Sequence, residues 1–171
     1  MIVCRIVKSC CDVCVGDVVQ SHIKERSFSE MRAKAEDYLE NVREKRYSMK
    51  LSRLNSIFVF PKDDKLEERA FHWARTFAST PDSSSKVYLL ELETDDVEWH
   101  NSQYYEDLYF LLDNKRYGMC DICSTKESLC KGYWENECNK EGLDVEGLTK
   151  NGKIVDITPY LVTHNNIRKL E

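Results

Sequence analysis

One stretch, residues 52–78, constrains the fold more than any other part of the chain. Its polar start, residues 52–56, leads into residues 57–61, where four β-branched or aromatic residues are closed by a proline. Such a run is typical of a short buried strand. Asp63 and Asp64 then offer N-cap oxygens, and apolar residues follow at helical spacing. The stretch therefore predicts a strand that turns tightly into an amphipathic helix.

Apolar patterns on both sides of this stretch predict further strands and helices. Ser27 and Glu30 fit a capping box at the start of a long helix, and Asn151-Gly152 between two strand-like runs indicates a hairpin. Strands are expected at residues 1–7, 86–93 and 153–157, and helices at residues 27–46, 66–78 and 104–112. Together they predict an α+β fold, with a split antiparallel sheet core and surrounding helices.

Length and charge limit the class of protein. A chain of 171 residues with 42% hydrophobic residues suits one domain, residues 1–171, with a real core. The net charge of −5 argues against a dedicated nucleic-acid binder, whose surface is usually basic. No segment approaches the roughly 20 apolar residues of a membrane helix, and Arg5 and Lys8 interrupt the apolar N-terminus. We therefore expect a cytoplasmic protein that does not contact a membrane.

Eight cysteines in a cytoplasmic protein are expected to be thiols or metal ligands rather than disulfides. Four of them fall in a cysteine-rich insertion, residues 117–138, with the spacing C-x2-C-x6-C-x7-C: Cys120, Cys123, Cys130 and Cys138. Four thiolates can close a tetrahedral structural zinc site. Two alternatives stay open: Cys11 and Cys14 join Cys120 and Cys123 in such a site, or the cysteines are buried hydrophobic residues.

An arginine interrupts the apolar first strand. Arg5 stands between Cys4 and Ile6, where a side chain with five donors needs a reason. One interpretation is an edge strand from which the arginine points into water. The other is an arginine aimed into a cleft, where its donors hold a ligand oxygen or phosphate.

The order of these parts resembles the ADP-ribosyltransferase superfamily, especially its small bacterial and phage branch. That superfamily has an arginine or histidine on its first strand, as at residues 3–7, and then a turn such as the Gly16-Asp17 turn. A serine or aromatic strand running into a helix follows, as in residues 52–78, and a further core strand, as in residues 87–92. A glutamate opens a late strand, as Glu141 does before Leu143 and Val145.

The resemblance implies a role for each matching residue. Arg5 would hold the ribose or phosphate side of NAD and contribute to catalysis. Glu141 would be the catalytic carboxylate that stabilises the developing cation, unless Glu135 or Glu137 of the Glu-x-Glu sequence takes that role. The remaining cofactor-binding residues would be Ser52, Arg53 and Asn55, which line the pocket, and Phe58, which stacks on the nicotinamide.

The function implied is an NAD-dependent ADP-ribosyltransferase that transfers ADP-ribose to a macromolecular acceptor, protein or nucleic acid, as a phage or bacterial effector. NAD would be its substrate, and any zinc would be structural. Breaking the nicotinamide–ribose bond passes through an oxocarbenium-like state, which a fixed carboxylate stabilises. The alternative is a small non-enzymatic binding or inhibitor protein on the same fold, stabilised by zinc. Its support is the acidic charge, the aromatic residues 99–105 and the absence of a strict catalytic motif.

Overall fold

The structure is a computed structural model of the whole chain. It describes residues 1–8, 13–21, 29–78, 80, 83–113, 125–135 and 142–171. The backbone divides into two compact units, which are described separately. The first unit contains residues 1–20, 58–97 and 151–171, and the second contains residues 21–57 and 98–150. None of the helices in the described ranges is sufficiently long and apolar to span a membrane.

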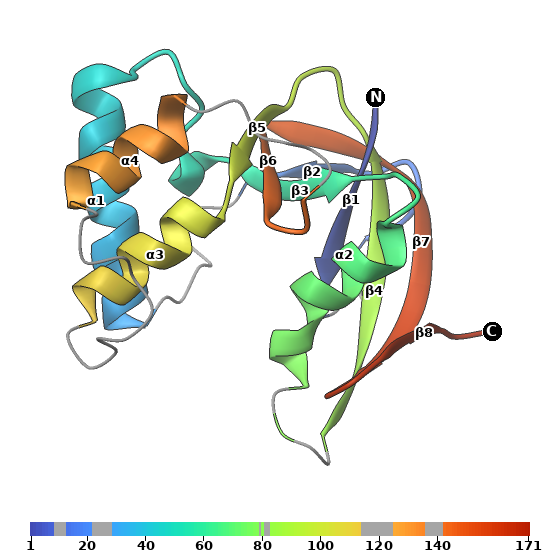
Figure 1. The fold of residues 1–171 in the computed structure, drawn as a ribbon. Helices are drawn as coiled ribbons and strands as arrows, with labels where there is room; N and C mark the ends of the chain where they lie inside the picture. The colour runs from blue at the N-terminus through green and yellow to red at the C-terminus, as the bar shows by residue number, and fades with distance from the viewer. Residues whose placement is uncertain (9–12, 22–28, 79, 81–82, 114–124, 136–141) are drawn as a thin grey trace. The chain divides into compact units, whose positions relative to one another are not determined.

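The first unit is built on an antiparallel sheet. Its strands follow each other in the order β2-β7-β4-β1-β3, and β8 pairs with β7 (Figure 1). Their bounds are β1 Ile2–Val7, β2 Val18–Gln20, β3 Ile57–Pro61, β4 Ser84–Glu93, β7 Asn151–Thr163 and β8 Ile167–Lys169. The predicted strands at residues 1–7 and 86–93 are thus confirmed, and each described pair is antiparallel.

A tight turn leads into β2, as the glycine and aspartate of the sequence predict. Gly16 has a φ of 101°, a conformation that suits a residue without a Cβ. The Asp17 carboxylate accepts a hydrogen bond from the Cys14 N–H at 2.8 Å, and the Gly16 N–H donates to the Ile154 carbonyl oxygen at 2.8 Å. The turn is therefore fixed both to itself and to β7.

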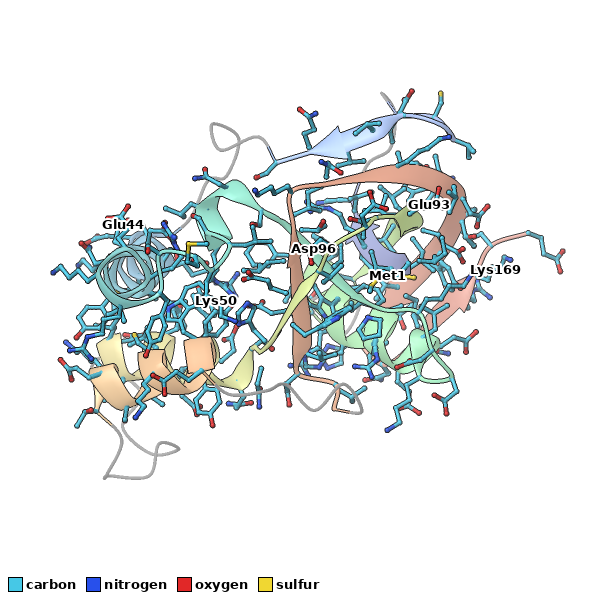
Figure 2. The ribbon with its side chains drawn as sticks, turned by 90° about the horizontal axis from the view of Figure 1, so that it is seen from above. Met1, Glu44, Lys50, Glu93, Asp96 and Lys169 are labelled. Atoms are coloured by element: carbon cyan, nitrogen blue, oxygen red, sulfur yellow. The ribbon has the colours of Figure 1, made fainter. Side chains whose placement is uncertain are left out.

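The N-terminus is bound to the end of β4. The Met1 ammonium donates to the Thr94 carbonyl oxygen at 2.6 Å, and the Thr94 N–H donates back to the Met1 carbonyl oxygen at 3.0 Å. Figure 2 labels Met1, Glu93 and Asp96 in this region. Because β1 pairs with β3 on one side and β4 on the other, it is an interior strand. The edge-strand interpretation of Arg5 is therefore wrong.

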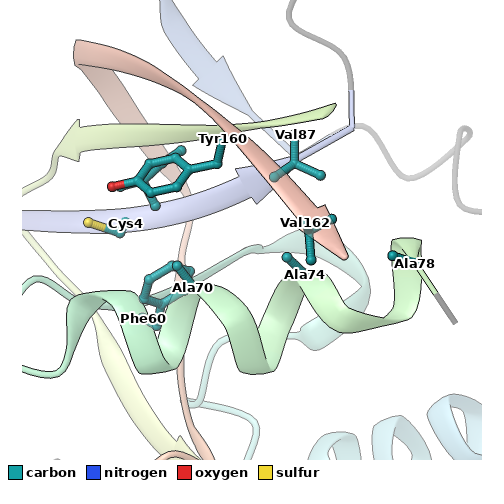
Figure 3. Close-up of a cluster of buried hydrophobic side chains, with 9 residues drawn as sticks. Cys4, Phe60, Ala70, Ala74, Ala78, Val87, Tyr160 and Val162 are labelled. Carbon is teal, nitrogen blue, oxygen red and sulfur yellow. The ribbon is translucent and has the colours of Figure 1, made fainter. Parts of the chain in front are cut away.

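Helix α2, Leu66–Ala74, covers one face of this sheet and continues as a 3₁₀ turn, η3, Arg75–Phe77. Figure 3 shows the cluster beneath it, in which small helix residues let the helix approach the strands closely. The buried members are Cys4, Phe60, Ala70, Ala74, Ala78, Val87, Leu89, Tyr160 and Val162. The strand–turn–helix prediction for residues 52–78 is confirmed, although the last turn is 3₁₀ rather than α.

The start of α2 contains an ion pair between a buried arginine and a partly exposed aspartate. The Arg69 side chain is fully buried, and its Nη2 donates to Asp63 Oδ2 at 2.9 Å. Asp63 Oδ1 also accepts from the Lys65 N–H at 3.0 Å, so Asp63 caps the turn although Lys65 occupies the N-cap position. Burial raises the pKa of the Asp63 carboxyl, but the hydrogen bonds and charges of Arg69 and Lys65 together lower it more, so its pKa lies below the ordinary value.

The second unit combines three helices with a two-stranded antiparallel ladder. Helices α1, α3 and α4 pack on one another (Figure 1). Element bounds in this unit are α1 Glu30–Arg46, η2 Arg53–Asn55, β5 Glu98–Asn101, α3 Gln103–Leu112, α4 Lys126–Glu135 and β6 Val145–Thr149. With the first unit, this gives a mixed antiparallel-sheet and helix protein, so the α+β class is confirmed.

Several predicted elements need correction. Helix α1 is capped by Ser29, whose Oγ accepts from the Arg32 N–H, and Ser27 lies outside the described residues. Residues Glu98–Asn101, where no strand was predicted, form strand β5. Strand β6 pairs with β5, whereas β7 pairs with β4, β2 and β8, so the hairpin expected at Asn151-Gly152 does not form. The C-terminal residues contribute a further strand, β8, which was not predicted.

Candidate functional site

The second unit contains a buried ionic cluster centred on Arg53. The polar residues before β3 fold into the 3₁₀ turn η2, in which the Asn55 N–H donates to the Ser52 carbonyl oxygen at 3.2 Å. The Ser56 hydroxyl donates to the same carbonyl at 2.6 Å. This turn directs Arg53 inward, and its side chain is only 5% exposed.

Two glutamates and a tyrosine surround the Arg53 guanidinium. The Glu36 carboxylate of α1 is held in a fork, with Nε to Oε2 at 2.9 Å and Nη2 to Oε1 at 3.0 Å. Nη1 donates to the Tyr133 hydroxyl of α4 at 2.8 Å and to Glu146 Oε1 of β6. The Tyr133 hydroxyl donates to the same Glu146 oxygen. Glu36 and Glu146 are both buried.

Aromatic rings enclose the guanidinium. Its central carbon lies 4.1 Å from the centre of the Tyr105 ring and 5.1 Å from that of Tyr133, which is cation–π geometry. Burial lowers the pKa of Arg53, but its anionic surroundings, Glu36 among them, raise the pKa above the ordinary value. Burial also raises the pKa of Tyr133 and Tyr105, so both hydroxyls are neutral.

The arrangement fixes the Glu146 carboxylate. Arg53 and Tyr133 both donate to Oε1, and their own positions are set by α4, η2 and the fork to Glu36. A carboxylate held in this way in a dry environment needs no reorganisation to stabilise a cation that develops beside it. Preorganisation is the chemical property that this cluster offers.

Strand β5 adds a histidine beside this cluster. His100 is the direct cross-strand partner of Glu146, so the two side chains lie on the same face of the ladder. The imidazole is buried and stacks on the Tyr133 ring, with centres 4.6 Å apart and planes 7° apart. Its Nδ1 lies 3.0 Å from the Tyr133 carbonyl oxygen. Tyr133 therefore contacts Arg53, Glu146 and His100.

The predicted cofactor-binding residues Ser52, Arg53 and Asn55 lie in the second unit. Arg53 is directed to protein partners rather than to an open pocket. Ser52 precedes η2, and its Oγ is buried without a hydrogen-bond partner among the described residues. Asn55 is exposed. The three neighbours therefore have three different surroundings.

Arg5 and Phe58 lie in the first unit, on opposite faces of its sheet. Cys4 is paired with Phe60, so both point to the face covered by α2, and Phe58 follows Phe60 by strand alternation. Arg5 points to the other face, with Val3, and both predicted residues are half-buried. Strand geometry does not bring these two side chains together.

Several predicted residues fall outside the described ranges: Glu141, Glu137, Cys11, Cys120, Cys123 and Cys138. Their roles stay predictions. Cys130 is buried in α4, where burial raises the pKa of its thiol to about 12. Glu135 is exposed and accepts from the Tyr47 hydroxyl at 2.7 Å. Within the described ranges, no group of three or more histidine, cysteine, aspartate or glutamate side chains is arranged to hold a metal.

Sequence reasoning missed Glu36, Tyr133 and Glu146, although two of them left a signal. Glu36 stands three positions before the buried Leu39, and therefore on the inward face of α1. Glu146 interrupts the apolar run of β6. A charge on a buried face indicates a buried partner. Tyr133 left no such signal, because aromatic residues are common in helix cores.

A family model described as "Protein of unknown function (DUF2441)" matches residues 14–158. The chain belongs to the DUF2441 family. The DUF2441 match includes the whole Arg53 cluster and His100, whereas Arg5 lies before it. No curated protein matches this chain.

Proposed function

We propose that this chain is an NAD-dependent ADP-ribosyltransferase with the split antiparallel sheet of that superfamily. The observation that carries the proposal is the fixed carboxylate of Glu146 on the late strand β6. It supports the proposal because the superfamily places its catalytic glutamate on a late strand. The resemblance in the order of elements supplies the assignment of NAD.

In this proposal Glu146 stabilises the cation that forms on ribose as nicotinamide leaves. Arg53 and Tyr133 hold its Oε1, and we assign the contact with ribose to Oε2. Arg53 thus has a positioning role instead of the cofactor-lining role expected from the sequence. Glu141, six residues after Glu135 and just before β6, stays the competing candidate for the carboxylate.

Transfer to an acceptor is tested by incubating the protein with bacterial lysate and NAD labelled on its adenylate part. An ADP-ribosyltransferase transfers the label to a macromolecule, and digestion with protease or nuclease then identifies its class. Label that appears only with wild-type protein, and not with Glu146→Gln, supports the proposal. Label on no macromolecule contradicts transfer to a macromolecular acceptor.

A non-enzymatic binding protein is the second candidate. The saturation of Arg53 by internal partners favours it, because such clusters also occur as purely structural features. The aromatic residues 99–105, which were expected to support binding, belong to regular elements: Trp99 lies in β5, and Tyr105 is buried in α3. A binder captures the same partner before and after Glu146→Gln, whereas an enzyme loses turnover.

A further inference from the structure

His100 has a buried ring nitrogen that makes no hydrogen bond to the residues described in the second unit. A backbone carbonyl accepts hydrogen bonds but cannot donate, so Nδ1, 3.0 Å from the Tyr133 carbonyl oxygen, carries the proton. Nε2 is then the nitrogen with the free electron pair in the neutral ring. Nε2 is buried and has no hydrogen-bond partner in the described part of the chain. Leaving such an atom unpaired costs stability, so its position needs a reason.

The ring cannot easily turn away. It is stacked on Tyr133 and meets the Trp134 ring edge-on, with centres 5.3 Å apart. The bond from Nδ1 fixes the remaining rotation. Nε2 is therefore held in one direction, toward the carboxylate of Glu98, its neighbour two residues before on the same face of β5.

The distance to Glu98 is the informative quantity. Nε2 lies 3.7 Å from Glu98 Oε2, and this oxygen is itself fixed by the Leu51 N–H at 2.8 Å. A hydrogen bond would need about 2.7–3.2 Å. Zinc lies about 2.0–2.1 Å from an imidazole nitrogen and about 2.0–2.2 Å from a carboxylate oxygen, so angles of roughly 110–120° separate the two ligand atoms by roughly 3.3–3.7 Å.

We propose that His100 Nε2 and Glu98 Oε2 hold a divalent transition-metal ion of the zinc class. A backbone carbonyl that accepts from Nδ1–H is one of the usual partners of metal-binding histidines, because such a bond fixes the tautomer and the ring orientation. The Glu98 side chain is 23% exposed, so the pair is open to solvent on one side. Water or a ligand atom fills the remaining positions, which leaves the ion open to chemistry or to exchange.

The cysteines of this chain could also bind zinc, so the test counts equivalents. Metal-free protein is titrated with Zn²⁺ by calorimetry as wild type, His100→Gln, Glu98→Gln and the control His164→Gln, which changes an exposed histidine of the first unit. We expect His100→Gln to lose one equivalent and His164→Gln to lose none. Glu98→Gln, which leaves the ring in place, should weaken that equivalent at least about 10-fold. Unchanged stoichiometry and affinity in both site variants would overturn the proposal.

A second measurement decides the question even if His100→Gln does not fold. In wild-type protein, ¹⁵N NMR of the histidine rings separates Nδ1 from Nε2. Adding Zn²⁺ should shift the Nε2 signal of His100 while Nδ1 keeps its proton. An Nε2 signal that does not respond to saturating Zn²⁺ refutes the site.

Discussion

Replacing Arg53 by methionine tests whether the buried cluster holds the second unit together. The change keeps an unbranched side chain of similar reach but removes the charge and every donor. Glu36 and Glu146 then remain buried without the guanidinium that pairs them, and the cation–π contact with Tyr105 is lost.

The expected loss in free energy of unfolding follows from the number of buried carboxylates that lose their cation. Removing one partner of a buried ion pair typically costs about 3–5 kcal/mol, and here one cation serves two carboxylates. With an m-value of about 2 kcal/mol per M, the urea midpoint should fall by about 2 M. In the double variant Arg53→Met/Glu36→Gln one stranded charge is gone, so the total should be smaller than the sum of the single effects by about 1–3 kcal/mol.

Urea unfolding followed by tryptophan fluorescence measures this effect. Trp99 and Trp134 lie in the second unit, and Trp73→Phe removes the signal of the first. Arg46→Met is the matched control, because Arg46 is also an arginine of the second unit but is exposed. It should cost no more than about 0.5 kcal/mol. A cost below about 1 kcal/mol for Arg53→Met, or strict additivity with Glu36→Gln, would refute the reasoning.

Three further outcomes are expected. Gly132→Ala should cost about 1–3 kcal/mol in urea unfolding, because the added Cβ would lie 2.5 Å from a carbon of the Tyr104 ring; a stability equal to wild type would show that the ring moves freely. At pH 8, mass spectrometry after brief alkylation should find the exposed Cys14 modified and Cys130, buried with a pKa of about 12, unmodified; equal rates would contradict this. The lowered pKa of Asp63 means that its ion pair stabilises the fold above the ordinary value of 3.8 and that this contribution is lost as the pH falls below it. Asp63→Asn should therefore flatten the acid limb of the stability curve, and an unchanged limb would contradict the pairing.

The local sequence pattern was sufficient to predict the elements that have a distinctive composition or spacing of their own. Strand β3 is a dense run of β-branched and aromatic residues, and α2 follows from the spacing of its apolar residues. The start of α1 was predicted at Ser27, but the cap is Ser29, a second serine that can also cap a helix. Boundaries of this kind depend on a single hydrogen bond.

Elements that depend on a distant partner could not be predicted in this way. Strand β5 is four residues long with no apolar alternation, and it exists by pairing with β6. Helix α4 was not predicted, because the cysteine spacing was interpreted as a zinc site. Thr125 and Ser128 nevertheless form a reciprocal capping pair at its start, with N–H to side-chain oxygen distances of 2.9 and 3.1 Å. That pair is a sequence signal from which the start of the helix could have been predicted.

The candidate site shows the same limit. The family resemblance singled out Arg53 as a cofactor-binding residue, but its partners come from residues 17, 80 and 93 positions away along the chain. A single sequence shows where charged and apolar residues stand along the chain. It does not show which buried carboxylate pairs with which buried arginine. Arg53 was therefore named as a site residue before the structure was known, but the residues that surround it were not.

The most direct test of the proposed function is nicotinamide release from NAD by wild-type protein, Glu146→Gln and Glu141→Gln, with and without lysate as acceptor. The account predicts release by wild type and a loss of about 10²-fold or more in Glu146→Gln, with NAD affinity in calorimetry unchanged, because the charge acts mainly in the transition state. Glu141→Gln should stay close to wild type. No release by wild type under any condition, or a loss confined to Glu141→Gln, would contradict the role given to Glu146.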